Sequence, residues 1–146
     1  MKHLLLITLF LTLLSCSSKE DDPLPTHSVE VRLSYYYNAY QGYKPDAGAY
    51  LFLFKEGNYI PDWLDARIGT LRMKETESKV KYLFKGEADA LGVARIDNVP
   101  QGRYLVVVAS KGRFSYSKKV VEVNKDISLV KNFGYRDEFN DNGELW

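Results

Sequence analysis

The sequence contains very little cysteine, no strong excess of either charge and no long hydrophobic run. Of its 146 residues only Cys16 is a cysteine, so an internal disulfide cannot form and a packed core must supply stability. Lysine and arginine number 20 and aspartate and glutamate 19, which argues against nucleic acid as a partner. The longest apolar run, residues 4–14, is too short for a transmembrane helix, which takes about 20 residues.

Histidine is nearly as scarce, and this limits the chemistry that the chain can perform. His3 lies in the N-terminal segment, and His27 is the other histidine. The remaining residues offer no Ser-His-acid or Cys-His arrangement, no Gly-rich phosphate loop and no paired-cysteine zinc spacing. A glycosidase-like pair of carboxylates stays open, but no pair stands out. We therefore expect a protein that is not an enzyme and binds no cofactor or metal.

The first 15 residues have the parts of a secretory signal peptide. A basic head, residues 1–3, precedes the apolar run. Residues 13–16, LLSC, resemble the lipobox of bacterial lipoproteins, whose cysteine becomes the lipidated N-terminus. The resemblance implies cleavage between Ser15 and Cys16 and several acyl chains on Cys16, because one chain anchors a protein only marginally. A free thiol beside an ordinarily cleaved signal is the alternative.

Residues 16–27 are expected to form a tether between the membrane lipid and the folded domain. The stretch SSKEDD after Cys16 is too polar to bury, and Pro23 and Pro25 hold its end extended. This acidic stretch also resembles the export signal of some Gram-negative lipoproteins. The resemblance implies an extracytoplasmic protein anchored to the outer membrane of a Gram-negative bacterium, with its domain at the cell surface.

From residue 28 onwards, short β-rich runs alternate with turn residues. Residues 28–37 alternate apolar and polar side chains, which indicates a half-buried strand. Residues 103–109 are apolar on both faces, which predicts a central strand. Further strands are predicted at residues 48–54, 80–84, 93–96, 114–123 and 127–133. About seven short strands predict an all-β fold, a single antiparallel β-sandwich over residues 28–134, with an up-and-down barrel as the alternative.

Two turn signals and one long connection lie between these strands. Asp89 and Gly92 occupy the first and last positions of a predicted type I turn, and residues 99–102 (VPQG) suit another. The connection over residues 55–79 is unusually long, which is typical of a functional or mobile segment. Within it, residues 61–66 could form one helical turn that begins at Pro61.

Residues 87–112, EADALGVARIDNVPQGRYLVVVASKG, resemble the signature of carboxypeptidase regulatory-like and collagen-adhesin B-type domains. These families have a D-x-x-G turn, a short strand and then N-[VL]-P-x-G-x-Y before an apolar strand. The matching positions here are Asp89, Gly92, Asn98, Val99, Pro100, Gly102 and Tyr104. Residues 48–53, GAYLFL, also resemble the opening strand of the families. The resemblance implies a transthyretin-like (prealbumin-like) sandwich and is nearly silent about function.

Some adhesin-type relatives form an isopeptide bond between a lysine of the first strand and an asparagine of the last. The last strand here offers Asn132, but the first offers Arg32 and no lysine precedes Lys44. Because a guanidinium stays charged, it is not a usable nucleophile, and we expect no such cross-link.

Aromatic residues are abundant, with eleven tyrosines, two tryptophans and seven phenylalanines. Three consecutive tyrosines, residues 35–37, cannot all face the core of one strand. Exposed rings with a polar edge suit sugars or protein partners, although they also cover sheet edges in many proteins. The candidate ligand-binding residues are Tyr36, Tyr40, Tyr59 and Trp63.

Residues 135–146 are expected to form a solvated acidic tail. Aligning Gly143 with the glycine of an EF-hand loop places Glu138, Asn140 and Asn142 at ligand positions, but no glutamate is available at position twelve. A solvated tail is therefore favoured over a calcium site.

Three functions are compatible with these features. The first is a lipoprotein with a non-catalytic binding or accessory role in the cell envelope, with membrane lipid and an envelope protein or glycan as partners. The second is a structural, fimbria-like subunit that assembles by strand addition. The third is a carbohydrate-binding module at the cell surface.

Overall fold

The structure is a computed structural model that describes residues 24–57, 59–60, 70–73, 79–113, 115–135 and 146. The regular elements of these residues are all strands, which confirms the predicted all-β class. The strands are β1 (Thr26–Asn38), β2 (Gly42–Pro45), β3 (Tyr50–Lys55), β4 (Tyr59–Ile60), β5 (Thr70–Met73), β6 (Lys79–Lys81), β7 (Phe84–Glu87), β8 (Val93–Pro100), β9 (Gly102–Ala109), β10 (Tyr116–Val123) and β11 (Ile127–Phe133).

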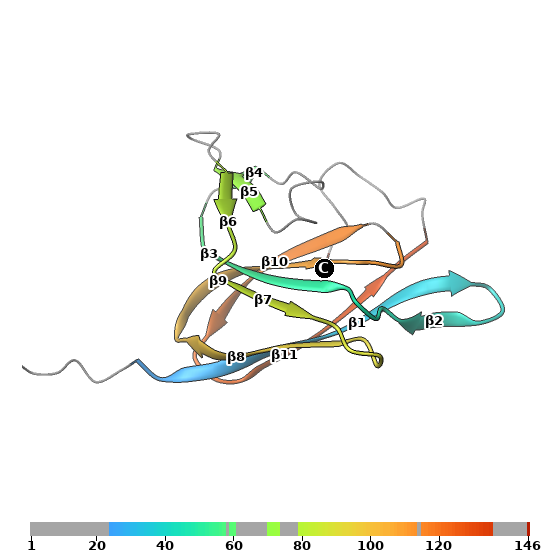
Figure 1. Ribbon diagram of the computed structural model, residues 1–146, viewed down its shortest axis with the longest axis horizontal. Helices are drawn as coiled ribbons and strands as arrows, with labels where there is room; N and C mark the ends of the chain where they lie inside the picture. The colour runs from blue at the N-terminus through green and yellow to red at the C-terminus, as the bar shows by residue number, and fades with distance from the viewer. Residues whose placement is uncertain (1–23, 58, 61–69, 74–78, 114, 136–145) are drawn as a thin grey trace, which may run out of the picture.

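Two sheets form the predicted β-sandwich (Figure 1). One sheet has the order β11-β1-β2, with β8 also paired to β1, and the other has the order β10-β9-β3-β7. Most side chains between the sheets are buried and aliphatic, because β1, β3 and β9 place apolar residues at the alternate positions that face inward. They include Val29, Val31, Leu33, Leu51, Leu53, Val106 and Val108.

The central strand β9 is buried on both faces, as its continuous apolar run predicts. Its second face packs in a separate cluster made of Phe52, Phe54, Leu105, Val107, Ala109 and Tyr116. The sheet that contains β9 therefore contributes to two apolar layers.

The pairing of β1 with β11 is parallel, which departs from the antiparallel arrangement predicted for the sandwich. In this pair Val29 lies opposite Ile127 and Tyr35 opposite Phe133. The reason is the connection after β10. That strand ends at the same end of the sandwich at which β1 begins, and a short turn crosses to the other sheet, so β11 must run alongside β1 in the same direction.

One edge of β1 is shared by two strands, which meet at Leu33. β8 pairs with β1 as far as Arg32, and β2 pairs with it from Ser34 onwards. At the junction Leu33 N donates to Gly92 O at 2.7 Å, and Asp46 N donates to Leu33 O at 3.0 Å. A Cβ on Gly92 would lie 2.3 Å from Leu33 O, and its φ is +76°. The glycine of the D-x-x-G motif is thus required where three strands converge.

Both predicted turns connect consecutive strands. Gly92 N donates to Asp89 O at 3.0 Å, so residues 89–92 form a hydrogen-bonded β-turn between β7 and β8. At the other turn, between β8 and β9, the Tyr104 hydroxyl donates to Pro100 O at 2.8 Å. Burial raises the pKa of the Tyr104 hydroxyl.

The long connection contains strands that the sequence did not predict. β4, β5 and β6 form a small three-stranded sheet, and the strand predicted at 80–84 is divided between β6 and β7. The helical turn predicted at 61–66 lies outside the described residues. β4 has only two residues, and β2 is a four-residue strand with glycine and proline at its ends, so neither gives an apolar pattern.

The end of the sandwich at which β1 begins, here called the tether end, is closed by hydrogen bonds to the backbone. Asp126, between β10 and β11, accepts from Ser28 N at 2.8 Å through Oδ1. That N–H bond lowers the pKa of Asp126. Gln101 N donates to Pro25 O at 3.1 Å. The chain therefore enters the sandwich along a fixed path.

Candidate functional site

The β1–β2 hairpin projects beyond the other described strands at the end of the sandwich opposite the tether end (Figure 1). Asn38 Oδ1 accepts from Tyr40 N at 3.0 Å and from Gln41 N at 2.8 Å, which closes the turn. Gly42 follows with a φ of +61°. The pairing register shifts between Tyr36 and Asn38, as at a β-bulge. The turn is thus well defined, and it leaves Tyr40 99% exposed at its tip.

Tyrosine rings from β1, from β2 and from the residues just after β11 contact one another at this hairpin. The Tyr36 ring packs edge-to-face against Tyr43, with centroids 5.6 Å apart, and against Tyr135 just after β11, at 5.9 Å. On the neighbouring positions Tyr35 and Tyr37 form a further edge-to-face pair at 6.3 Å. Each such pair contributes about 0.5–1.5 kcal/mol beyond burial. The rings therefore support one another while much of their surface stays accessible.

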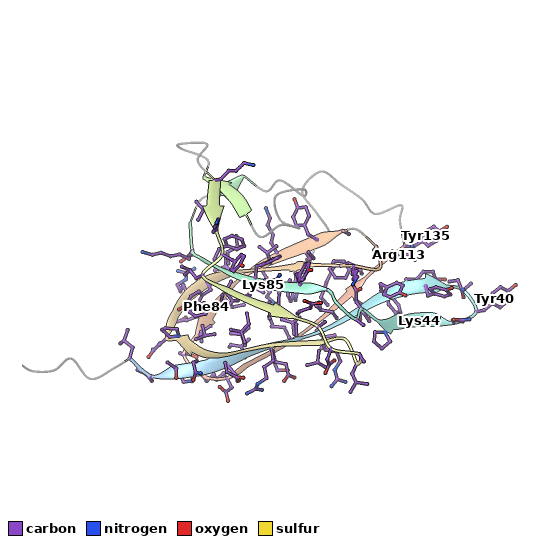
Figure 2. All side chains as sticks on the ribbon, in the orientation of Figure 1. Tyr40, Lys44, Phe84, Lys85, Arg113 and Tyr135 are labelled. Atoms are coloured by element: carbon purple, nitrogen blue, oxygen red, sulfur yellow. The ribbon has the colours of Figure 1, made fainter. Side chains whose placement is uncertain are left out.

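Two cations lie against these rings. Arg113, in the loop between β9 and β10, places its guanidinium carbon 5.8 Å from the Tyr135 ring centroid. Its Nη2 donates to Tyr36 O, and its Nε is buried without a described partner. Lys44 Nζ lies 3.7 Å from the Tyr37 centroid. Figure 2 shows Arg113 beside Tyr135, with Lys44 and Tyr40 along the hairpin. We call this assembly of residues 35–45, Arg113 and Tyr135 the tyrosine end.

The loop that carries Arg113 is held from three directions. Arg113 N donates to Ser110 Oγ at 3.0 Å, and Gly112 N donates to Asp46 Oδ1 at 2.9 Å. Asp46 is only 1% exposed. A Cβ on Gly112 would lie 2.7 Å from the Tyr35 ring, so the loop backbone rests on that ring. Arg113 is consequently positioned before any ligand arrives.

A shallow hollow of about 730 Å³ lies between the hairpin and the Arg113 loop. Its volume is in the range of small-molecule sites, roughly 300–1,000 Å³. Rings, a cation and an amide surround it, which suits a ligand with apolar faces and polar edges. The lining residues are Tyr36, Tyr37, Asn38, Ala39, Arg113 and Tyr135.

The structure separates the residues that the sequence singled out. Tyr36 lines the hollow and Tyr40 lies at the hairpin tip next to it. Tyr59 belongs to β4, in the small sheet rather than the hairpin. Trp63, Ser15 and Cys16 lie outside the described residues. No local sequence pattern indicated that Arg113 or Tyr135 belongs to this site. Only the fact that arginine and tyrosine are common in binding sites could have suggested them.

The structure also places Arg32 and Asn132, the residues considered for an isopeptide bond. Arg32 is exposed, and Asn132 is exposed and accepts from Ser34 Oγ at 2.6 Å. The buried residues of this part of β11 are Lys131 and Phe133, and Lys131 Nζ lies 5.2 Å from the Phe133 centroid. Arg32 and Asn132 therefore do not meet within the core.

The C-terminal residue lies against the sandwich. Trp146 packs against the core between the sheets, and Lys119 Nζ lies 6.0 Å from its ring. Residues 136–145, which include the calcium alignment, are outside the described part of the chain. The described residues contain no cluster of potential metal ligands. Nor do they contain a helix long and apolar enough to span a membrane.

No family model and no curated protein sequence matches the chain. Several solved structures resemble it weakly. The minor pilin GBS52 of Streptococcus agalactiae is 13% identical over 81% of this chain and 48% of the pilin, with a TM-score of 0.44. This chain thus spans about half of that pilin's length.

Two further structures give similar values. The Pseudomonas aeruginosa protein PA1324, for which carbohydrate binding has been suggested, is 14% identical over 74% of this chain and 90% of its own, with a TM-score of 0.47. The pilus protein RrgB of Streptococcus pneumoniae is 13% identical over 82% of this chain and 28% of its own, with a TM-score of 0.46. At these values the likeness carries no functional argument, and the fold assignment rests on the strand order given above.

Proposed function

We propose that this chain is a lipid-anchored, extracytoplasmic binding module of the cell envelope without catalytic activity, attached through Cys16 to the outer membrane of a Gram-negative bacterium. The LLSC motif and the acidic stretch behind it support the anchor and its location. The scarcity of histidine and cysteine supports a binding role over a catalytic one.

The placement of the tyrosine end carries this proposal. β1 has 13 residues, a length of roughly 40 Å as an extended strand. Its first residues follow the tether, and its last residues form the hairpin with the tyrosines (Figure 1). With lipid on Cys16, the hollow would face away from the membrane, where it could meet a ligand.

The composition of the tyrosine end also favours binding. Tyrosine and arginine are enriched at recognition surfaces, because they bring large contact areas and directional donors. A residue that is 99% exposed, such as Tyr40, adds little to the stability of the fold. Its ring is therefore available to a partner.

Strand addition, the alternative mode of assembly, is less well supported by the sheet edges. Among the described strands, the outer strands are β10 and β7 in one sheet and β11, β2 and β8 in the other. β10 carries Lys118 and Lys119, and β11 carries the inward-facing Lys131. Charges of this kind on edge strands oppose pairing with further strands.

The anchor is tested by a Cys16→Ser variant with a detector at the C-terminus. We expect the parent chain to fractionate with membranes and to incorporate labelled fatty acid, and the variant to lose both properties, because no other residue can accept the lipid. Ser17→Ala is the matched control, since it changes a neighbouring residue and leaves the thiol. Unchanged membrane association of the Cys16→Ser variant would contradict the proposal.

A further inference from the structure

The guanidinium of Arg113 retains donors that the fold does not use. Nη2 donates one hydrogen bond to Tyr36 O, and Nε is buried. The two N–H groups of Nη1 and the second of Nη2 have no partner among the described residues. These donors belong to a planar guanidinium, and paired N–H groups of a guanidinium match the spacing of two oxygens on a carboxylate, sulfate or phosphate.

Two cations of the tyrosine end have no ion-pair partner among the described residues. Neither Arg113 nor Lys44 forms an ion pair with a carboxylate in the described part of the chain, whereas Arg95 and Arg103 are paired with Glu30, Asp97 and Glu56 at 2.8–3.3 Å. The carboxylate of Asp46 is buried and accepts from Gly112 N. Among the described residues, the tyrosine end thus carries two cations without an ion pair above the buried Asp46 carboxylate, and these cations can attract an anionic ligand.

The rings add a second requirement. Tyr36, Tyr37 and Tyr135 line the same hollow as Arg113, and each offers a flat apolar face with a hydroxyl at its edge. A saccharide ring has the complementary character, with C–H groups on its faces and hydroxyls around its rim. Combined with the guanidinium of Arg113, this lining fits a sugar that carries an anionic group.

We infer that the ligand of the tyrosine end is an acidic saccharide, whose anionic group Arg113 binds while the tyrosines contact its rings. This inference rests on the binding function proposed for that end. Lys44, held over Tyr37, provides a weaker second cation at the rim. A protein partner with an acidic surface is the competing occupant. The shallow hollow allows such a partner, but the tyrosine rings that line it favour a sugar.

The test uses the full-length chain in detergent micelles and four polymers. They are polygalacturonate (a carboxylate polymer), its carboxyl-reduced neutral form, dextran sulfate and dextran. We expect one of the two acidic polymers to bind about tenfold more tightly than its neutral counterpart, with weaker binding as salt rises from about 50 to about 300 mM. Which acidic polymer binds distinguishes a carboxylate ligand from a sulfate ligand.

Three variants test the role of the cations. Arg113→Gln is expected to weaken acidic-polymer binding about tenfold, and Arg113→Lys to restore it only in part, because lysine cannot bind two oxygens in a fork. Lys44→Gln should weaken binding a few-fold without disturbing the Arg113 loop. The matched control is Lys85→Gln. Lys85 lies on β7, away from the hairpin (Figure 2), and its Nζ is 4.1 Å from the ring centroid of Tyr50.

The outcomes separate this inference from the proposed function. In one outcome, acidic and neutral polymers bind equally, Arg113→Gln and Lys44→Gln change nothing, and Tyr40→Ser abolishes binding. This outcome would overturn the inference and leave a site for a neutral ligand. Binding to none of the polymers by a correctly folded parent chain would overturn the inference in favour of a protein partner. Acidic binding that Lys85→Gln weakens as much as Lys44→Gln would also overturn it, since it would reflect charge alone.

Discussion

The tether end and the tyrosine end belong to the same strands, yet they differ in what their side chains do. At the tether end, Tyr104 and Asp126 direct their polar atoms to the backbone, and each closes a connection. At the tyrosine end, Tyr40 and the unpaired donors of Arg113 point to no described partner. The tether end uses these polar groups to hold the fold together. The tyrosine end also closes its turn through Asn38, but it leaves other polar groups accessible.

The junction between the two ends explains how the second can remain rigid. Leu33, Asp46 and Gly92 join β1, β2 and β8, and Asp46 also holds the loop of Arg113. The backbone of the tyrosine end is therefore fixed by buried contacts beneath it. Its exposed side chains are then free to differ without loss of the fold.

Gly92→Ala should give the largest effect on stability. Its Cβ would clash with Leu33 O, and its φ of +76° is unfavourable for alanine, so we expect a loss of about 3 kcal/mol or more. The matched control is Gly42→Ala, with a φ of +61° and nothing within 4 Å of its Cβ. It should cost only about 1–2 kcal/mol. Chemical denaturation measures both, and equal losses would mean that the junction is not constrained as described.

A smaller effect is expected at the tether end, in the acid range. The Ser28 N–H bond lowers the pKa of Asp126, so the folded state binds this proton more weakly than the unfolded state. The resulting stabilisation is present above the unfolded pKa, about 4, and is lost as the pH falls through the lower folded value. The unfolding free energy of Asp126→Asn should therefore fall less between pH 5 and pH 2 than that of the parent. Parallel curves would contradict this role.

The sequence was sufficient for those parts of the fold in which the pattern is local. The alternation along β1, the apolar run of β9 and the Asp89–Gly92 turn each follow from neighbouring residues. The parallel pairing of β11 was not predictable, because it depends on where β10 ends in space. β2 was missed because its four residues have no apolar alternation.

The candidate site was only half predictable for a similar reason. The run of tyrosines indicated that some rings must face away from the core, which identified Tyr36. Arg113 reaches the backbone of Tyr36 across 77 residues of sequence. No local pattern indicates such a contact, since it arises from the way β1 and β9 lie in opposite sheets.

The central claim is that the two ends have separate roles, and Tyr40→Ser tests it most directly. The paired measurement is the thermal unfolding midpoint and the affinity for the polymer that the parent chain binds best. Because Tyr40 is 99% exposed, we expect an unchanged unfolding midpoint. Because its ring lies at the hairpin tip next to the hollow, where a bound polymer would contact it, we expect an affinity reduced about tenfold. Leu24→Ser, which removes a 66% exposed side chain at the tether end, should change neither. A Tyr40→Ser variant that binds as tightly as the parent would contradict the account.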